Sequence, residues 1–110
     1  MKNIVINLTS ENYEKLKNNG LCLNCIYTIL KVLNNKQITE MIENDFEYIR
    51  MKKENKKNFK KNEHKLLTRK IKVDNETYNK LNVLKEHLDI SKNFIVNKVL
   101  EKVLQWKKIK

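Results

Sequence analysis

Two cysteines, Cys22 and Cys25, are the residues whose types and spacing most resemble a chemical site. A CxxC pair can hold a metal ion or alternate between two thiols and a disulfide. A structural zinc ion needs four ligands, however, and the chain offers only His64 and His87 besides this one cysteine pair. The βαβ pattern of a thioredoxin-like redox motif is also missing. We therefore expect no metal and no other cofactor, and we assign both cysteines to the turn and core around a helix.

Catalytic patterns are missing as well. The chain contains one glycine, which leaves no Gly-rich loop to cradle a phosphate. No grouping of nucleophile, base and oxyanion donors stands out along the sequence. The sequence therefore predicts that the protein is not an enzyme.

Hydrogen-bonding side chains instead alternate with apolar ones through most of two short segments, residues 3–8 and 68–73, with Val5 and Arg69 as the exceptions. Alternation with a period of two is typical of a strand that turns one face to a core. The side chains expected to face the core are Ile6, Leu8, Ile71 and Val73. Those expected to face outward are Asn3, Val5, Asn7, Thr68, Lys70 and Lys72.

Both segments belong to a repeat, because IVINLTSENYEKL at 4–16 recurs as RKIKVDNETYNKL at 69–81. Each copy predicts a strand, then a helix cap (Thr9 or Ser10 in the first, Asp74 in the second), then an amphipathic helix. Tyr13 and Tyr78 recur at the same helical position, where we expect them to pack rather than to stack on a base.

A second helix follows in each copy. The first is expected at about 23–33, after a stop at Gly20, and the second at about 92–106, after a cap at Ser91. The later helix is apolar over more than one stripe, which predicts burial between two repeats or two subunits. Between the copies, residues 36–49 predict one acidic amphipathic helix. Residues 52–65, rich in Lys and Asn, predict a flexible or weakly helical linker that adds nonspecific attraction to a polyanion.

Composition limits the class of protein and of partner. A chain of 110 residues is too short for two independent cores, so the repeats are expected to share one. Its formal charge of +11 favours phosphate-bearing partners. No apolar run approaches the roughly 18 residues of a membrane span, and a strand pattern begins too early for a signal peptide. The expectation is a cytoplasmic protein without membrane contact, in the host cytoplasm if it is viral.

The order of strand, helix, tight turn and helix resembles the ribbon-helix-helix family of DNA-binding regulators. The match is best over residues 68–104, where KIKVDNETYNKL is followed by LDISKNFIVNKVL. Asp89, Ile90 and Ser91 occupy the family's turn, with Asp in place of the usual Gly. In the divergent first copy, that turn is Gly20, Leu21 and Cys22. Tandem chains of this size and composition resemble regulators from archaeal viruses and plasmids.

The resemblance implies a mainly α fold with short β structure. It divides the chain into a first ribbon-helix-helix unit at 1–35, an extra helix and basic linker at 36–66, and a second unit at 67–110. Strands of such units pair antiparallel into two-stranded ribbons that enter the DNA major groove. The two strands can come from one chain, as an intramolecular pseudo-dimer, or from two chains of a homodimer.

The same resemblance implies the DNA contacts. Base contacts would come from the outward strand residues Asn3, Val5, Asn7, Thr68, Lys70 and Lys72. Phosphate contacts would come from the backbone at the start of each second helix, at Leu23, Asn24, Ser91, Lys92 and Asn93. Because the two strands differ on their outward face, the preferred site would be an imperfect palindrome.

The expected function is sequence-specific binding of double-stranded DNA by a transcription regulator, most simply a repressor, with no small-molecule substrate. Two alternatives stay open. An antitoxin-type autoregulator would also bind a partner protein, for which the acidic segment 36–49 offers a surface. A nonspecific architectural protein would coat DNA with little preference for sequence.

Overall fold

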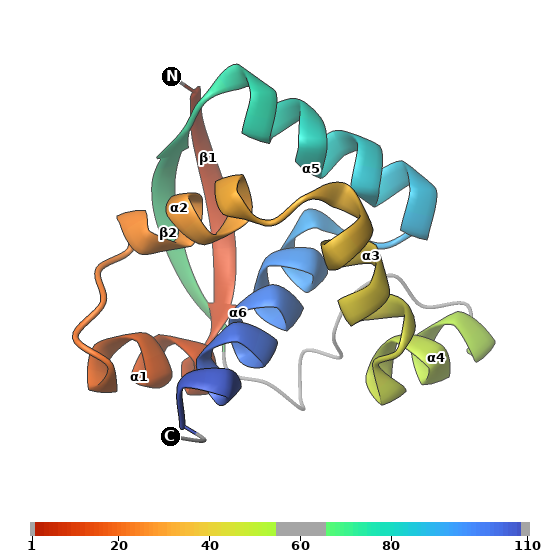
Figure 1. The fold of residues 1–110 in the computed structure, drawn as a ribbon, viewed down its shortest axis with the longest axis horizontal. Helices are drawn as coiled ribbons and strands as arrows, with labels where there is room; N and C mark the ends of the chain where they lie inside the picture. The colour runs from red at the N-terminus through yellow and green to blue at the C-terminus, as the bar shows by residue number, and fades with distance from the viewer. Residues whose placement is uncertain (1, 55–65, 109–110) are drawn as a thin grey trace.

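The computed structural model describes residues 2–54 and 66–108, with side chains up to residue 104. These residues form six helices and one two-stranded sheet (Figure 1). The elements are β1 (Lys2–Thr9), α1 (Ser10–Asn18), α2 (Asn24–Val32), α3 (Asn35–Glu43), α4 (Phe46–Lys53), β2 (Leu66–Val73), α5 (Asn75–Leu88) and α6 (Lys92–Lys108). The prediction of a mainly helical chain with short strands is confirmed.

The sheet joins the first copy of the repeat to the second, because β1 pairs antiparallel with β2. Its inward face is apolar and buried, as the alternation predicts. The side chains buried on that face are Ile4, Ile6, Leu8, Ile71 and Val73. Two paired strands are at best marginally stable alone, so the sheet depends on the helices packed against this face.

The helix after each strand begins at the predicted cap. The Thr9 hydroxyl accepts the Asn12 N–H at 3.3 Å, and the Asp74 carboxylate accepts the Thr77 N–H at 2.7 Å. The ends differ because α1 has 9 residues and α5 has 14. Gly20, just after α1, has a φ of 69°, and Asp89, just after α5, has a φ of 54°. Both turns therefore use the left-handed conformation, which Gly and Asp tolerate better than most residues.

Helix α6 runs through the middle of the molecule and packs against β1, α1, α2, α3 and α5 (Figure 1). Its buried apolar side chains are Phe94, Ile95, Val96, Val99, Leu100 and Leu104. The prediction that this helix is buried on more than one face is confirmed. Fully burying one such side chain stabilises a fold by about 1.5–3 kcal/mol, which makes α6 the main organiser of the core.

The insert between the repeats differs from the single helix predicted over 36–49. The structure has two helices there, α3 and α4, with α3 ending at its cap residue Asn44. The Asp45 carboxylate accepts the backbone N–H groups of Glu47 and Tyr48, which starts α4 in a new direction. Ile49, the apolar residue at the end of the predicted amphipathic helix, is 53% exposed. The two-helix arrangement follows from the capping carboxylate, which breaks the helical hydrogen-bond ladder.

Asp45 is also held by a buried lysine on α6. The Lys98 ammonium lies 3.2 Å from Asp45, 2.7 Å from Glu47 and 3.3 Å from Glu101, and its side chain is 4% exposed. Lys102 lies 3.0 Å from the second oxygen of Asp45. This Lys98 cluster fixes the start of α4 against α6, so the insert is joined to the shared core rather than hanging outside it.

The structure describes only the first residues of the predicted linker over 52–65. Lys52 and Lys53 belong to α4, whereas residues 55–65 lie outside the described part of the chain. Lys52 forms an ion pair with Asp89 at 3.3 Å, which ties the end of α4 to the turn before α6. The predicted nonspecific role of the linker's lysines therefore stays a prediction.

Candidate nucleic-acid interface

The register of the sheet follows the internal repeat. Within the repeat, each residue of the first copy corresponds to the residue 65 positions later, so Val5 corresponds to Lys70. In the sheet, Val5 lies directly opposite Lys70. The neighbouring outward pairs are Asn3 opposite Lys72 and Asn7 opposite Thr68. In the repeat, Asn3 corresponds to Thr68 and Asn7 to Lys72, so the repeat relates one pair to the other. A local two-fold axis therefore passes through the pair Val5 and Lys70, and the two copies face each other across it.

The outward face of the sheet carries all six residues predicted to contact bases. Five are exposed and Asn7 is half-buried. The Thr68 hydroxyl lies 2.9 Å from the Asn7 side-chain oxygen, to which it donates. Val5 is 57% exposed although it is apolar and sits in the middle of this face. The outward residues of the strands include Lys70 and Lys72 and no acidic residue, so the face is positive.

Helix α6 of the second copy is hydrogen-bonded to the end of β1 from the first copy. The Asn97 side-chain oxygen accepts the Thr9 N–H at 2.9 Å and the Asn12 amide at 3.0 Å. Its side-chain nitrogen donates to the Asn7 carbonyl at 2.8 Å. Asn93, one turn earlier, accepts the Asn7 N–H at 3.0 Å. These hydrogen bonds fix the position of Asn7 relative to the start of α6.

The reciprocal contacts join α2 of the first copy to the start of α5 and to Lys80 in the second copy. The Tyr27 hydroxyl donates to Asp74 at 2.9 Å, and the Lys31 ammonium lies 3.6 Å from the same carboxylate. From the other side, Lys80 of α5 donates to the carbonyls of Leu30 at 2.9 Å and Leu33 at 2.6 Å. A cation at the C-terminal end of a helix satisfies unpaired carbonyls and the helix dipole. Each copy's second helix therefore holds the strand-to-helix junction of the other copy.

The Asp74 junction leads to a prediction about pH. Hydrogen bonds from Thr77, and then from Tyr27, lower the pKa of Asp74 from 3.8 to about 2. A carboxylate whose pKa is lower in the folded state stabilises the fold above its unfolded pKa, and this stabilisation is lost as pH falls through the folded pKa. Between pH 4 and pH 2 we therefore expect the free energy of unfolding to fall more for the natural chain than for Asp74→Asn, measured by urea denaturation. Asn caps a helix almost as well but does not titrate, so parallel losses in the two chains would contradict this prediction.

The two repeated tyrosines also connect the copies. The Arg69 guanidinium of β2 lies 5.2 Å from the ring centre of Tyr13, and the Lys2 ammonium of β1 lies 4.7 Å from that of Tyr78. Lys92 lies 4.5 Å from the Tyr78 ring as well. Cations at such distances are attracted by the negative ring face. Each tyrosine is half-buried and covered by a cation of the opposite strand, which favours the predicted packing role over base stacking.

The start of α6 has the features predicted for a phosphate contact. Ser91 accepts the Phe94 N–H at 3.1 Å, so it is the cap that the sequence predicted. The first N–H groups of a helix have no partner within the helix, and its dipole makes this end positive. The Asn93 side chain is bonded to β1, so Asn93 can offer a phosphate its backbone rather than its amide. The side chain of Lys92 adds a positive charge at the same end.

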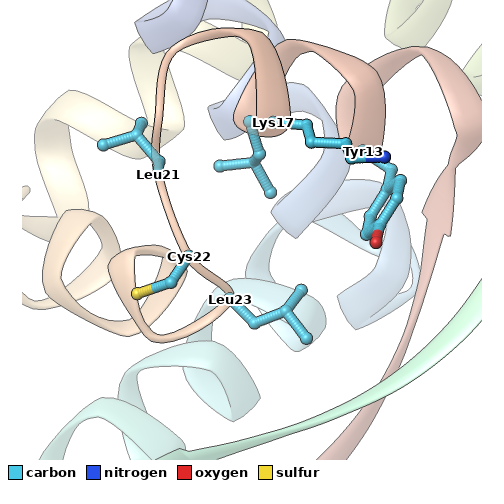
Figure 2. Close-up of a pocket in the computed structure, with 6 residues that line it drawn as sticks. Tyr13, Lys17, Leu21, Cys22 and Leu23 are labelled. Carbon is cyan, nitrogen blue, oxygen red and sulfur yellow. The ribbon is translucent and has the colours of Figure 1, made fainter.

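The start of α2 is built differently. Leu23 occupies the position before the helix and packs against the core, whereas Asn24 and Cys22 are exposed. Leu23 and Tyr13 line a hollow of about 120 Å³, and the Cys22 sulfur points away from Tyr13 (Figure 2). The Cys22 and Cys25 sulfurs lie 3.6 Å apart, both as free thiols. Neither is buried, so the expectation that they contribute to the core is wrong.

Two polar residues that organise this region were missed by the sequence analysis. Asn97 and Lys98 are 1% and 3% exposed in the middle of α6. Their signal was present, because they interrupt the apolar run FIV-NK-VL, where a buried polar residue must have a partner. The partners, Asn12 and the carboxylates of α4, lie more than fifty residues away in the chain, which is why spacing alone did not reveal them.

Within residues 2–54 and 66–108 there is no group of three or more His, Cys, Asp or Glu side chains placed to hold a metal ion. None of the described helices combines the length and the apolar character needed to cross a membrane. Comparison with protein-family models, curated proteins and solved structures finds no match to this chain.

Proposed function

We propose that the protein is a sequence-specific regulator that binds double-stranded DNA through the ribbon formed by β1 and β2. The two copies of the repeat are its two ribbon-helix-helix units, paired within one chain. The major groove admits a two-stranded ribbon and presents a distinct pattern of donors and acceptors for each base pair. Occupancy of an operator would repress transcription without a cofactor.

The observation that carries the proposal is the two-fold register of the ribbon. Val5 and Lys70 correspond in the repeat and lie opposite each other, so the outward face has the symmetry of a palindromic DNA site. The chemistry of that face suits bases, since Lys can donate to guanine, Asn can pair with adenine and Val can meet the methyl group of thymine. Val5, the exposed apolar residue at the centre of this face, is not stabilised by contact with water.

The positions of the second helices support the same mode of binding. α6 is bonded to the edge of β1 through Asn93 and Asn97, and α2 to the start of α5 through Tyr27. A helix N-terminus can bind a phosphate on each side of the groove and thereby fix the register of the ribbon on DNA. The phosphate contacts are assigned to Ser91, Lys92 and Asn93 on one side and to Leu23 and Asn24 on the other.

Selection of bound sequences from random duplexes, followed by footprinting at physiological salt, tests the proposal. The expected result is an imperfect palindrome, because one end of the ribbon presents Asn3 beside Lys72 and the other presents Asn7 beside Thr68. A specific regulator prefers its site to random DNA by roughly 10³ to 10⁷. Enrichment of no motif at all would contradict the proposal and favour the architectural alternative.

Substitution of the ribbon lysines locates the contacts. Lys70→Ala and Lys72→Ala are each expected to cost about 1–3 kcal/mol at the selected operator and to relax the preference at defined base pairs. Lys36→Ala, on the exposed start of α3, is the control and should leave the preference unchanged. Val5→Lys should make the centre of the ribbon symmetric and shift selection towards a more perfect palindrome. Equal weakening of all sequences by Lys70→Ala and Lys72→Ala would contradict base reading.

A second candidate function is supported by the surface of α4. Phe46 and Ile49 are 85% and 53% exposed on this helix, although both are large and apolar. Neighbouring exposed apolar side chains are typical of a protein-binding site. An antitoxin-type regulator would use such a surface for its partner. Stoichiometric co-purification of one protein with the natural chain, lost on Phe46→Ser, would support this function, and no such protein would count against it.

A further inference from the structure

Cys22, which is exposed, and Cys25, which is half-buried, place two thiols at the start of α2 with their sulfurs 3.6 Å apart. A disulfide requires a separation of about 2.05 Å, so closure needs a movement of only about 1.5 Å in a turn at the surface. A metal ion would need further ligands, and the described part of the chain offers no third group beside this pair. The pair is therefore suited to thiol and disulfide chemistry.

Comparison of the two copies shows what the pair replaces. Cys22 stands where Ser91 stands in the second copy, and Cys25 stands where Phe94 stands. In the second copy the Ser91 hydroxyl caps the Phe94 N–H, and Phe94 is fully buried. The first copy has a thiol at both places, and the turn leaves Cys22 exposed to solvent. The repeat thus has one ordinary cap and one dithiol at equivalent helix starts.

We propose that Cys22 and Cys25 are a redox modification site, whose conversion between dithiol and disulfide sets the affinity of the α2 end for a DNA phosphate. The effect on DNA rests on the proposed function, whereas formation of the disulfide does not. The co-reactant is a low-molecular-weight disulfide, for which glutathione disulfide is the probe.

Exchange proceeds in two balanced steps. The Cys22 thiolate attacks one sulfur of the probe, which forms a mixed disulfide and releases one glutathione thiolate. Cys25 then loses its proton to water and attacks the Cys22 sulfur, which releases the second glutathione. The two protein thiols are oxidised to one disulfide, and one glutathione disulfide is reduced to two thiols. Hydrogen bonds from the Cys25 side chain, and then from the backbone at Cys25 and Asn24, lower the pKa of Cys22, which makes it the attacking residue.

The same contacts explain the effect on DNA. In the reduced state, a thiolate at Cys22 places negative charge beside the N–H groups that would face a phosphate. Negative charge near a helix N-terminus is satisfied by the dipole and competes with a second anion there. The disulfide is neutral and removes this competition. The oxidised protein is therefore expected to bind the selected operator about two- to fivefold more tightly than the reduced protein, with a difference that grows as pH rises through the Cys22 pKa.

The test uses the full chain equilibrated with glutathione buffers of increasing oxidation. Mass spectrometry after alkylation should show both thiols lost together, with a monomer lighter by two hydrogen atoms. Operator affinity, measured on the same samples at pH 8.5, should rise in parallel. Four results would each overturn the proposal: persistent mixed disulfides, covalent dimers, unreacted thiols, or a stoichiometric metal ion on the reduced chain. So would a disulfide that leaves operator affinity unchanged.

Matched variants separate this proposal from the proposed function. Cys22→Ser copies the cap of the second repeat, so it should bind the operator as tightly as the oxidised protein in every buffer. Cys25→Ser retains the Cys22 thiolate and should bind the operator as the reduced protein does. Its affinity is measured after unreacted glutathione has been removed and mass spectrometry has excluded a mixed disulfide. A chain that forms the disulfide but selects no operator would refute the proposed function, and with it the effect on DNA, but not the disulfide itself.

Discussion

Replacing Lys98 by alanine is expected to lower the free energy of unfolding by about 3–5 kcal/mol, the largest loss we expect from a single change. The Lys98 side chain is 4% exposed, and its ammonium lies within 3.3 Å of Asp45, Glu47 and Glu101. Its removal takes one of the two lysines that pair with the nearly buried Asp45 carboxylate and leaves Lys102 to balance its charge. A buried charge that loses its partner keeps its cost of desolvation.

The pKa values of the cluster agree with this expectation. Burial alone would raise the pKa of Asp45, but Lys102 and Lys98 outweigh it and hold the pKa below its usual value. Burial alone would lower the pKa of Lys98, but Glu47 and the neighbouring carboxylates raise it. The cluster therefore stabilises the fold fully between the unfolded pKa values of Asp and Lys. This contribution is lost as pH falls through the folded pKa of Asp45 or rises through that of Lys98.

Urea denaturation at pH 7 measures the effect of Lys98→Ala. Lys85→Ala, an exposed lysine of α5, is the control and should change the free energy of unfolding by less than about 0.5 kcal/mol. Lys98→Arg should retain part of the stability because the charge remains. A loss from Lys98→Ala as small as that from Lys85→Ala would show that α4 is not anchored by the cluster.

Replacing Asn97 by alanine is expected to cost about 2–4 kcal/mol. The Asn97 side chain bonds the Thr9 N–H, the Asn7 carbonyl and the Asn12 amide, and Asn97 is 1% exposed. Leaving a buried donor or acceptor without its partner costs about 1–3 kcal/mol for each group, and the better helix propensity of Ala offsets a small part. The loss should also loosen the end of β1 beside α6.

Thr28 supplies the matched control, because it occupies the place in α2 that Asn97 occupies in α6. It is exposed, so Thr28→Ala should change the free energy of unfolding by no more than about 0.5 kcal/mol. Hydrogen exchange of the β1 amides near Thr9 should accelerate in Asn97→Ala and not in Thr28→Ala. Unchanged exchange in both variants would show that Asn97 is not what holds this strand to α6.

Local patterns predicted the strands and their helices well. Alternation assigned the inward and outward residues of both strands, because side chains of a strand must point to opposite faces. Thr9, Asp74 and Ser91 were recognised as caps because their side chains can reach the unpaired N–H groups of the next turn. Gly20 and Asp89 were recognised as turn residues because few other residues tolerate a positive φ. Each of these signals acts over a few residues.

The misses have a common cause in long-range contacts. Asp45 lies in the segment predicted as one acidic amphipathic helix, but it caps α4 and pairs with Lys98, 53 residues further along the chain. The exposure of Phe46 and Ile49 follows from the new direction of α4. Cys22 lies in the turn as expected, but it is exposed and Cys25 is only half-buried, so neither joins the core. None of these outcomes follows from spacing along one helix.

By itself the sequence determined the repeat, the strands with their two faces, and the caps that start and end the helices. These depend on periodicity and on hydrogen bonds between near neighbours, which are written in adjacent residues. Only the tertiary structure decided that β1 and β2 pair within one chain, with Val5 opposite Lys70 and each second helix holding the other copy. That choice depends on which buried groups satisfy one another across the shared core. Packing of α6 against both copies brings those groups together, and no local pattern records it.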